Sequence, residues 1–401
     1  MISKESVNYS LRNLKNRKFR SFLTIFSIFA GIVTIFIFIS FGAGLYKYVD
    51  EVAGSSSADK VLVMSKGGFG GLDTSFELTE DNLKDFAGTP GIYVSTGVYF
   101  RSVEIGFNDQ TIYSFLIGFD PQKPLIMEMS NIGISKGRML SSGDGRDILL
   151  GYNYQIKDRI FSKPIDLNNN IEINGEEFRV IGFLEEVGNP QDDSQVYIAD
   201  DAMKEFYGDE NLPYNWIIAS ADTSNMDQVV KNAEKSLRKS RGLEEGKEDF
   251  FVQSFTELME GYSTALNVIV AFIILIALIS ILVSSINTAN TMITSVLERV
   301  KEIGIIKSIG GKNSEVFKIF LFESSFLGFV AGVFGVVVGW AVSALGGEIL
   351  NQLGYGFLSP YFPLELFIGC ILFAVLTGAV SGVIPAINAT KINPVEALRY
   401  E

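Results

Sequence analysis

Four long stretches of the chain contain no charged residue, and each is long enough to cross a lipid bilayer as a helix. One helical crossing needs about 20 mostly apolar residues. The stretches cover residues 21–46, 261–297, 324–347 and 366–390. The second becomes polar after about residue 286, so we place its crossing near 265–286 and expect the helix to continue beyond it. The pattern predicts a membrane protein with four transmembrane α-helices.

The region between the first two stretches has shorter patterns, which predict a large α+β domain. Alternating or apolar runs indicate strands at 61–64, 111–117, 171–173, 178–181, 195–198 and 216–219. Helical patterns occur at 78–86, 200–207 and 226–239, the last with cap candidates at 222–224 and an apolar stripe at Val229, Val230, Ala233 and Leu237. Asn174-Gly175 separates two of the strands and favours a tight hairpin turn.

Basic residues indicate the orientation of the helices. The segment before the first stretch contains Lys4, Arg12, Lys15, Arg17, Lys18 and Arg20, which places the N-terminus in the cytoplasm by the positive-inside rule. A cleaved signal peptide is the alternative, but the apolar run exceeds the roughly 7–15 residues of a signal core and favours an uncleaved anchor. Four crossings return the C-terminus to the cytoplasm. The other inside segments are basic too, with Arg299, Lys301, Lys307, Lys312 and Lys318 before the third stretch and Lys391 and Arg399 in the tail.

These patterns divide the chain into four parts. We expect a basic cytoplasmic segment at 1–20, a transmembrane helix at 21–46, an extracytoplasmic α+β domain at 47–261 and a membrane domain at 262–401. The membrane domain should contain helices at about 265–286, 324–346 and 366–387, a cytoplasmic segment at 298–315 and a cytoplasmic tail at 388–401. The expected location is the plasma or inner membrane.

Composition supports this plan and excludes several kinds of chemistry. A mean hydropathy of +0.27 is high for a soluble chain. The net charge of −13 argues against nucleic-acid binding, which needs clustered basic surface. Residues 48–260 hold 19 basic and 37 acidic residues, so the acid is concentrated outside. With no histidine and the single cysteine Cys370, the sequence cannot form a Ser-His-Asp site, a His/Cys zinc site or an internal disulfide.

Two features of the outer region could suggest a ligand, and a simpler interpretation is favoured for each. The acidic pairs at 185–186, 192–193 and 200–201 lack the ligand spacing of an EF-hand and are interpreted as solvated surface acid. The glycine-rich run at 67–71 is not followed by the Lys-Ser/Thr of a phosphate-binding loop and is interpreted as an ordinary loop.

The segment after the second apolar stretch predicts a short amphipathic helix at the inner membrane surface. Ile303, Ile306 and Ile309 form its apolar side, and Gly310-Gly311 should end it. Asn313 or Ser314 can then cap the next helix. A short helix held between two membrane-spanning helices can pass motion from a soluble partner into the membrane. The alternative is a basic loop that merely fixes the topology.

Small residues recur at four-residue spacing in the last two stretches and predict close helix packing. The pairs are Gly328/Gly332, Gly335/Gly339 and Gly378/Gly382. Glycine lets helices approach closely, which favours association in lipid. The pattern leaves open whether the partner helices belong to the same protomer or to a second one. Glu323 lies near the inner boundary and is expected to stay hydrated there.

Several motifs resemble the FtsX-like permease domain of MacB-type ABC transporters. They are the segment Glu298-Arg299-Val300-Lys301-Glu302-Ile303-Gly304, the run Phe322-Glu323-Ser324-Ser325 with its following glycines, and the ending Asn393-Pro394-Val395-Glu396-Ala397-Leu398. In the outer region, Gly137-Arg138-Met139-Leu140, Leu149-Leu150-Gly151 and Phe178-Arg179-Val180-Ile181-Gly182 resemble the extracytoplasmic core domain of that family. Together these motifs cover nearly the whole chain.

The resemblance implies a permease homodimer that works with two copies of an ABC ATPase subunit. The sequence has no Gly-x-x-x-x-Gly-Lys-Ser/Thr motif, so ATP and Mg²⁺ would bind to a separate chain, and this chain would be non-catalytic and without a cofactor of its own. Carried onto matching positions, the ATPase-coupling residues are Glu298, Arg299, Glu302, Ile303, Gly304, Lys307 and Gly310. Whether an extracytoplasmic adaptor also binds stays open.

The expected function is mechanotransmission: ATP hydrolysis in the partner moves the outer domain and thereby exports or extracts a substrate. The alternative is an FtsX-like regulator or sensor that activates a cell-envelope enzyme without transport. An outer domain of more than 200 residues favours the MacB type. The sequence does not name the cargo.

Overall fold

The computed structural model describes residues 18–53, 57–66 and 76–399, which form two compact units. The membrane unit contains the chain up to Leu45, Leu266–Glu348 and the chain from Pro360 onward. The outer domain contains Tyr46–Ala265 and Ile349–Ser359. The basic segment before Lys18 and the glycine-rich run at 67–71 lie outside the described residues.

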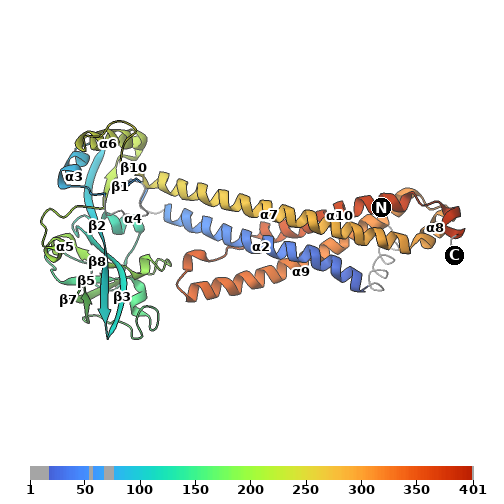
Figure 1. Ribbon diagram of the computed structural model, residues 1–401, viewed down its shortest axis with the longest axis horizontal. Helices are drawn as coiled ribbons and strands as arrows, with labels where there is room; N and C mark the ends of the chain where they lie inside the picture. The colour runs from blue at the N-terminus through green and yellow to red at the C-terminus, as the bar shows by residue number, and fades with distance from the viewer. Residues whose placement is uncertain (1–17, 54–56, 67–75, 400–401) are drawn as a thin grey trace. The chain divides into compact units, whose positions relative to one another are not determined.

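Four helices of the described residues are long and apolar enough to cross a membrane. They are α2 (Lys18–Ala53), α7 (Phe255–Glu298), α9 (Asn313–Gln352) and α10 (Leu364–Thr390), and each contains one of the predicted stretches. Figure 1 shows them as the long coiled ribbons of the molecule. Apolar side chains of α2, α9 and α10 share one core, which includes Ile32, Phe36, Ala331 and Ala374.

The six glycines singled out in the sequence lie where neighbouring helices of the same chain come close. A Cβ atom on Gly332 would stand 2.8 Å from the Cβ of Ala374 in α10, and Gly328 faces the backbone of the same residue. On the next turns, a Cβ on Gly335 would lie 2.9 Å from Ile32 of α2, and a Cβ on Gly339 would lie 3.0 Å from Phe36 of the same helix. Gly378 and Gly382 of α10 face Ser324 of α9. A methyl group at these positions would push the helices apart.

The outer domain is built on one mixed sheet, whose strand order is β10-β1-β9-β2-β3-β8-β5-β7-β4, with β6 pairing β2 and β7. The strands are β1 (Lys60–Ser65), β2 (Ile92–Phe107), β3 (Gln110–Phe119), β4 (Ile134–Gly137), β5 (Asp147–Leu150), β6 (Asn170–Ile173), β7 (Glu176–Leu184), β8 (Val196–Ala199), β9 (Trp216–Ala221) and β10 (Phe250–Ser254). The β3–β8 and β5–β7 pairs are parallel, and the other neighbours are antiparallel. The long strand β2 pairs β9 along its first half and β3 along its second, so it belongs to both parts of the sheet.

Helices cover the two faces of this sheet unequally. On one face, α3 (Glu80–Ala87), α5 (Asp200–Tyr207) and α6 (Met226–Ser240) enclose a large core (Figure 1). The predicted stripe of α6 is buried in this core, as expected. On the other face, the one-and-a-half-turn helix α4 (Leu125–Ser130) and the first residues of α7 pack on a second, smaller apolar cluster. Short 3₁₀ turns are η1 (Tyr152–Gln155), η2 (Asp192–Ser194), η3 (Thr223–Asn225) and η4 (Gly356–Leu358).

The predicted strands and helices of the outer domain are all confirmed, including the hairpin. Asn174 and Gly175 have φ values of 48° and 84° and connect β6 to β7. The strands β2, β4, β5 and β10 were not predicted from the sequence. Nor was a second hairpin, in which Asn108 and Asp109 both have positive φ between β2 and β3. The cap expected at 222–224 belongs to η3, where Asp222 accepts the Ser224 N–H, and not to α6 itself.

Candidate functional site

The candidate site is built around α8 (Val300–Ser308), the short helix that follows α7. Arg299 stands between the two helices and is 3% exposed. Its Nη1 lies 2.9 Å from Oε2 of Glu323 in α9, and its Nε lies 3.1 Å from Oε2 of Glu302, one turn further along. Its guanidinium also stacks over the Phe320 ring, 5.0 Å from the centroid. Arg299 therefore fixes the start of α8 to α9.

The other end of α8 is tied to the end of α10. The Lys307 ammonium donates to the carbonyl oxygens of Thr390 and Ile392, at 2.9 and 2.7 Å. Thr390 is the last residue of α10 and Ile392 lies in the turn after it, so the contact also favours the helix C-terminus electrostatically. The short helix α11 (Pro394–Arg399) then packs along α8. Asn393 begins α11 by accepting the Val395 N–H, and Pro394 occupies the first helical position, where its missing N–H costs nothing.

One side of α8 is buried and the other is open. Ile303 and Gly304 are buried in a cluster with Met292, Val316 and Phe320, and Ile306 packs against it. Ile305 and Ile309 are 52% and 80% exposed. The prediction that Ile309 completes the buried face is therefore wrong. The helix ends at Ser308, one residue before Ile309, and the chain then turns through Gly310, whose φ is +97°.

Two further expectations about this site are corrected. Glu323 is 4% exposed rather than hydrated, and its carboxylate is paired with the Arg299 guanidinium. Asn313 does not cap α9 from outside, because it is the first residue of that helix. The Glu315 carboxylate accepts the Lys312 N–H at 3.2 Å instead. Of the other candidate residues, Glu298 ends α7 at the surface, and Glu302 is half exposed beside Arg299.

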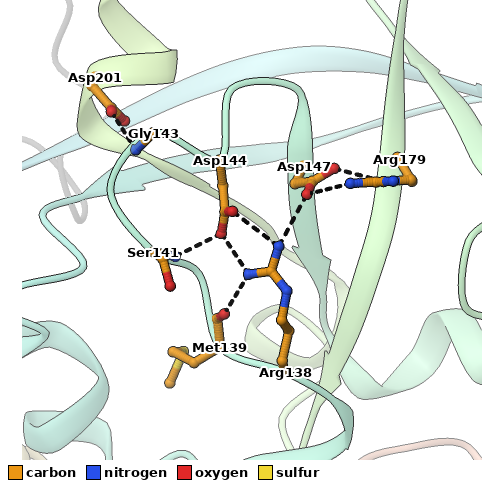
Figure 2. A network of polar contacts seen from close by, with 8 residues as sticks. All are labelled: Arg138, Met139, Ser141, Gly143, Asp144, Asp147, Arg179 and Asp201. Carbon is orange, nitrogen blue, oxygen red and sulfur yellow. Dashed lines mark hydrogen bonds and ion pairs between the residues drawn. The ribbon is translucent and has the colours of Figure 1, made fainter.

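In the outer domain, a second arginine network joins the motifs that lie far apart in the sequence. Figure 2 shows Arg138 between Asp144 and Asp147, with Arg179 approaching Asp147 from the other side. The Arg138 guanidinium donates to Asp144 at 2.7 and 2.9 Å and to Asp147 at 3.1 Å, and Arg179 donates to Asp147 at 2.8 and 2.7 Å. The Arg138 guanidinium holds the pKa of the Asp144 carboxyl below its ordinary value.

The neighbouring glycines show why those motifs need small residues. Gly137 in β4 pairs with Gly182 in β7, and Gly137 has a φ of +84°. A Cβ on Gly182 would lie 2.7 Å from the Arg138 carbonyl oxygen, so a side chain there would separate the two strands. The loop between Arg138 and Asp147 is further tied to α5, because the Gly143 N–H donates to Asp201 at 2.8 Å (Figure 2).

The acidic pair at 192–193 is not solvated surface acid. Asp193 is 1% exposed, and its carboxylate accepts the N–H groups of Val187 and Gly188 at 2.8 and 2.9 Å. Burial raises the pKa of Asp193 to about 6. The turn that it holds meets the outer segment between α9 and α10, because the Phe357 N–H donates to the Gly188 carbonyl at 3.0 Å. Arg159 adds to this contact by donating to the Gln352 carbonyl at 2.9 Å.

Glu323 and Asn393 are parts of the α8 site that were not predicted from the sequence, although both lie in motifs that resemble the family. Glu323 pairs with a residue 24 positions away, and no helical or strand periodicity connects the two. The tail motif gave a signal for Asn393, since Asn-Pro is a common start of a helix.

Comparisons with known proteins agree with the two-unit architecture. The model of the FtsX-like permease C-terminal family matches residues 274–394, and that of the MacB-like periplasmic core domain matches residues 21–236. An uncharacterized ABC transporter permease of Methanocaldococcus jannaschii is 30% identical over 397 residues, which is 98% of each chain. The uncharacterized ABC transporter permease YknZ of Bacillus subtilis is 27% identical over 80% of this chain and 79% of its own length.

This chain corresponds to only part of the length of some larger transporters. The macrolide export ATP-binding/permease protein MacB of Marinobacter nauticus is 25% identical over 99% of this chain, which spans 61% of that protein. Both family models, and relatives aligned over nearly all of this chain, point to the same assignment. The protein is therefore a multi-pass membrane protein that belongs to the ABC transporter permeases of the MacB/FtsX type.

Proposed function

We propose that the protein is the non-catalytic permease subunit of a MacB-like transporter and that α8 is the element through which a separate cytoplasmic ATPase moves it. The observation that carries this proposal is the double attachment of α8. Arg299 joins its start to α9, and Lys307 joins its end to the last turn of α10. A force on α8 therefore acts on two membrane helices together.

The open side of α8 offers a surface for the ATPase. Ile305 on α8 and Ile309, the residue that directly follows the helix, are four positions apart and exposed, and the charged Lys301 lies on the same helix. Apolar residues at this spacing are the usual anchors when a helix docks in a groove of a partner. The ATPase binds ATP and Mg²⁺ and supplies the hydrolysis, because this chain carries no phosphate-binding motif.

The proposed transporter also has a defined topology and subunit composition. Both termini and α8 lie in the cytoplasm, because the basic residues are concentrated there and the acidic outer domain lies on the opposite side. Two copies of the permease work with two ATPase subunits. Hydrolysis changes the conformation of the outer domain, which exports or extracts a substrate, with or without an extracytoplasmic adaptor. A regulator of a cell-envelope enzyme would use the same α8 site but would move no substrate.

Affinity purification from native membranes in mild detergent tests the proposal. The wild-type chain should recover a protein with a nucleotide-binding Walker motif. The double substitution Ile305→Asp with Ile309→Asp should lower that recovery about tenfold or more, since anchors of this kind contribute over 1.4 kcal/mol.

The matched control is Leu353→Asp, which alters a side chain that is 60% exposed in the outer domain. This variant should recover the ATPase as the wild type does. If no such protein is recovered with the wild type under several gentle conditions, the protein is a sensor or scaffold that acts without an ATPase.

A further inference from the structure

The outer domain contains a cavity of about 440 Å³ on the face of the sheet that carries α4. Its walls come from the sheet, from α4 and from the first turns of α7, with Phe100, Trp216, Phe255, Leu258 and Tyr262 among them. The opposite face of the sheet has a continuous core under α3, α5 and α6. Cavities of 300–1,000 Å³ with mostly apolar walls and a few polar groups are typical of small-molecule sites.

Methionine is concentrated around this cavity. Met64, Met127, Met129 and Met259 line it, which is four of the nine methionines of the chain. Methionine is unbranched and polarizable, so a surface rich in it can adapt to ligands of different shape. If these positions only filled a rigid core, leucine or isoleucine would pack there with fewer side-chain conformations. The composition therefore favours binding of a variable apolar body.

The polar wall of the cavity ends at a carboxylate. The Tyr197 hydroxyl donates to the side-chain Oε1 of Gln195 at 2.9 Å, and the Nε2 amide group of the same Gln195 side chain donates to Asp192 at 3.2 Å. The Asn189 amide donates to the other Asp192 oxygen at 2.9 Å. Among the described residues, Asp192 forms no ion pair with a lysine or arginine, and Asp193 is its neighbour. Burial raises the pKa of Asp192, although the Asn189 and Gln195 amides partly offset this effect.

We propose that this cavity binds an amphiphile with an apolar body and a single cationic group, and that Asp192 receives the cation. The apolar body lies among the methionines and the Phe100–Trp216 pair, whose ring centroids are 4.4 Å apart. This inference deepens the proposed function and rests on it for the claim that the bound molecule is a substrate. Since α7 forms one wall with Leu258 and Met259, movement of that helix would change the space available to the ligand.

The two tryptophans of the chain allow a direct test on the full-length protein in lipid nanodiscs. Trp340 is 46% exposed in α9, and Trp340→Phe leaves Trp216 as the single fluorescent tryptophan, inside the cavity wall. The probes are 12-bromododecylamine, 12-bromododecanol and 12-bromododecanoate, whose bromine quenches indole fluorescence at short range. Their chains match, and their head groups are cationic, neutral and anionic.

The cationic probe should quench Trp216 saturably and bind more tightly than the other two. Asp192→Asn should weaken binding of the amine about fivefold, as expected for one half-buried charge contact, and leave binding of the alcohol within about twofold. Ser130→Leu, which places bulk in the cavity wall, should weaken all three probes. Glu210→Gln removes an exposed carboxylate away from the cavity and should change nothing.

The proposal would be overturned if quenching rose linearly with the concentration of every probe and were the same in Asp192→Asn, Ser130→Leu and the wild type, because it would then report partition into the lipid. Saturable binding that is equal for the three head groups would overturn the role of Asp192. The quenching measurements do not need an ATPase, neither for the saturation of binding nor for its dependence on the head group. Failure here therefore leaves the assignment of α8 standing, and failure to recover an ATPase leaves this binding result standing.

Discussion

The membrane unit and the outer domain each contain an arginine network, and the two differ in their access to water. The Arg299 and Glu323 side chains are 4% and 6% exposed. In the outer domain, Asp147 is 9% exposed, but its partners Arg138 and Arg179 are 50% and 55% exposed. Both networks use short arginine–carboxylate contacts. They differ in how well water can solvate the charge that is left when one partner is removed.

Burial decides that difference. Water can solvate Arg138 or Arg179 when the carboxylate is lost, whereas a charge left beside Phe320 and the apolar cluster of α8 and α9 has little water to replace its partner. A buried pair is therefore costly to break but not necessarily costly to replace. This suggests that Arg299–Glu323 serves to define the position of α8, while the Asp147 network links strands of a domain that is held together chiefly by its core.

The largest expected effect is on the buried pair. Glu323→Leu should destabilise the attachment of α8 by about 3 kcal/mol, the lower end of the range for a broken buried pair, because the buried Arg299 cation keeps only the half-exposed Glu302 as a partner. Hydrogen exchange measured by mass spectrometry on the full chain should show a fall in protection of the 299–308 amides. The fall should be about a hundredfold or more.

The matched control is the double variant Arg299→Met with Glu323→Leu. It removes both charges and should recover most of the protection, since an apolar pair of similar size can replace a buried ion pair. If the double variant is as unprotected as the single one, the pair contributes through something other than charge, and the contrast with the outer domain fails.

A smaller effect is expected from Asp147→Ala in the outer domain. The substitution removes the shared acceptor of Arg138 and Arg179, but both arginines remain solvated. The melting temperature of the outer domain should fall by about 2–4 °C, corresponding to a loss of about 1 kcal/mol, the upper end of the range for exposed ion pairs. Trp216 fluorescence in the Trp340→Phe background can follow it. A loss as large as that of Glu323→Leu would show that exposure does not separate the two networks.

Asp193 provides a third case, a buried carboxyl whose hydrogen bonds come from backbone amides rather than from arginine. Its pKa of about 6 in the folded protein lies above the ordinary value, so the folded state binds the extra proton between about pH 4 and pH 6. The stability that this group contributes is therefore fully present below pH 4 and is lost as the pH rises through 6. Asp144, whose pKa is lowered, should show the opposite trend and lose its contribution as the pH falls below its folded value.

The measurement is the protection of the Val187 and Gly188 amides against pH, corrected for the intrinsic exchange rate. Protection should decrease by about fiftyfold between pH 4 and pH 7 in the wild type. In Asp193→Asn the dependence should be absent. A protection that rises with pH in the wild type would contradict the raised pKa.

The sequence predicted the membrane helices and much of the outer domain because these elements have strong local signals. The charge-free runs and the Asn174-Gly175 turn needed no knowledge of distant partners. The strand β2 was missed because Arg101, Ser102 and Glu104 interrupt its apolar pattern. One side of its second half is partly exposed. This half pairs with β3 at nine consecutive positions, and the pairing stabilises the strand despite its polar residues.

For the candidate site, the sequence indicated which residues are involved but not how they are paired. Arg299 and Lys307 were predicted from their motif, but their partners lie far away in the sequence: Glu323 and Thr390 in other helices and Ile392 in the turn after α10. Glu323 was expected in water because hydropathy treats an acid near a membrane boundary as solvated. Ile309 was assigned to the buried face because a three-residue repeat cannot show that the helix stops at Ser308.

The smallest expected effect concerns an arginine–carboxylate pair with both partners in water. Arg146 and Glu176 are 2.8 Å apart, with side chains 64% and 44% exposed. Glu176→Gln should shift the melting temperature of the outer domain by less than about 2 °C, because ordering two exposed side chains offsets most of the attraction. Raising the salt concentration should abolish even this shift, whereas the effect of Glu323→Leu on α8 should persist. If Glu176→Gln destabilises the domain as much as Asp147→Ala does, the short distance and not burial determines the strength of these pairs, and the ranking of the two networks and this pair by burial fails.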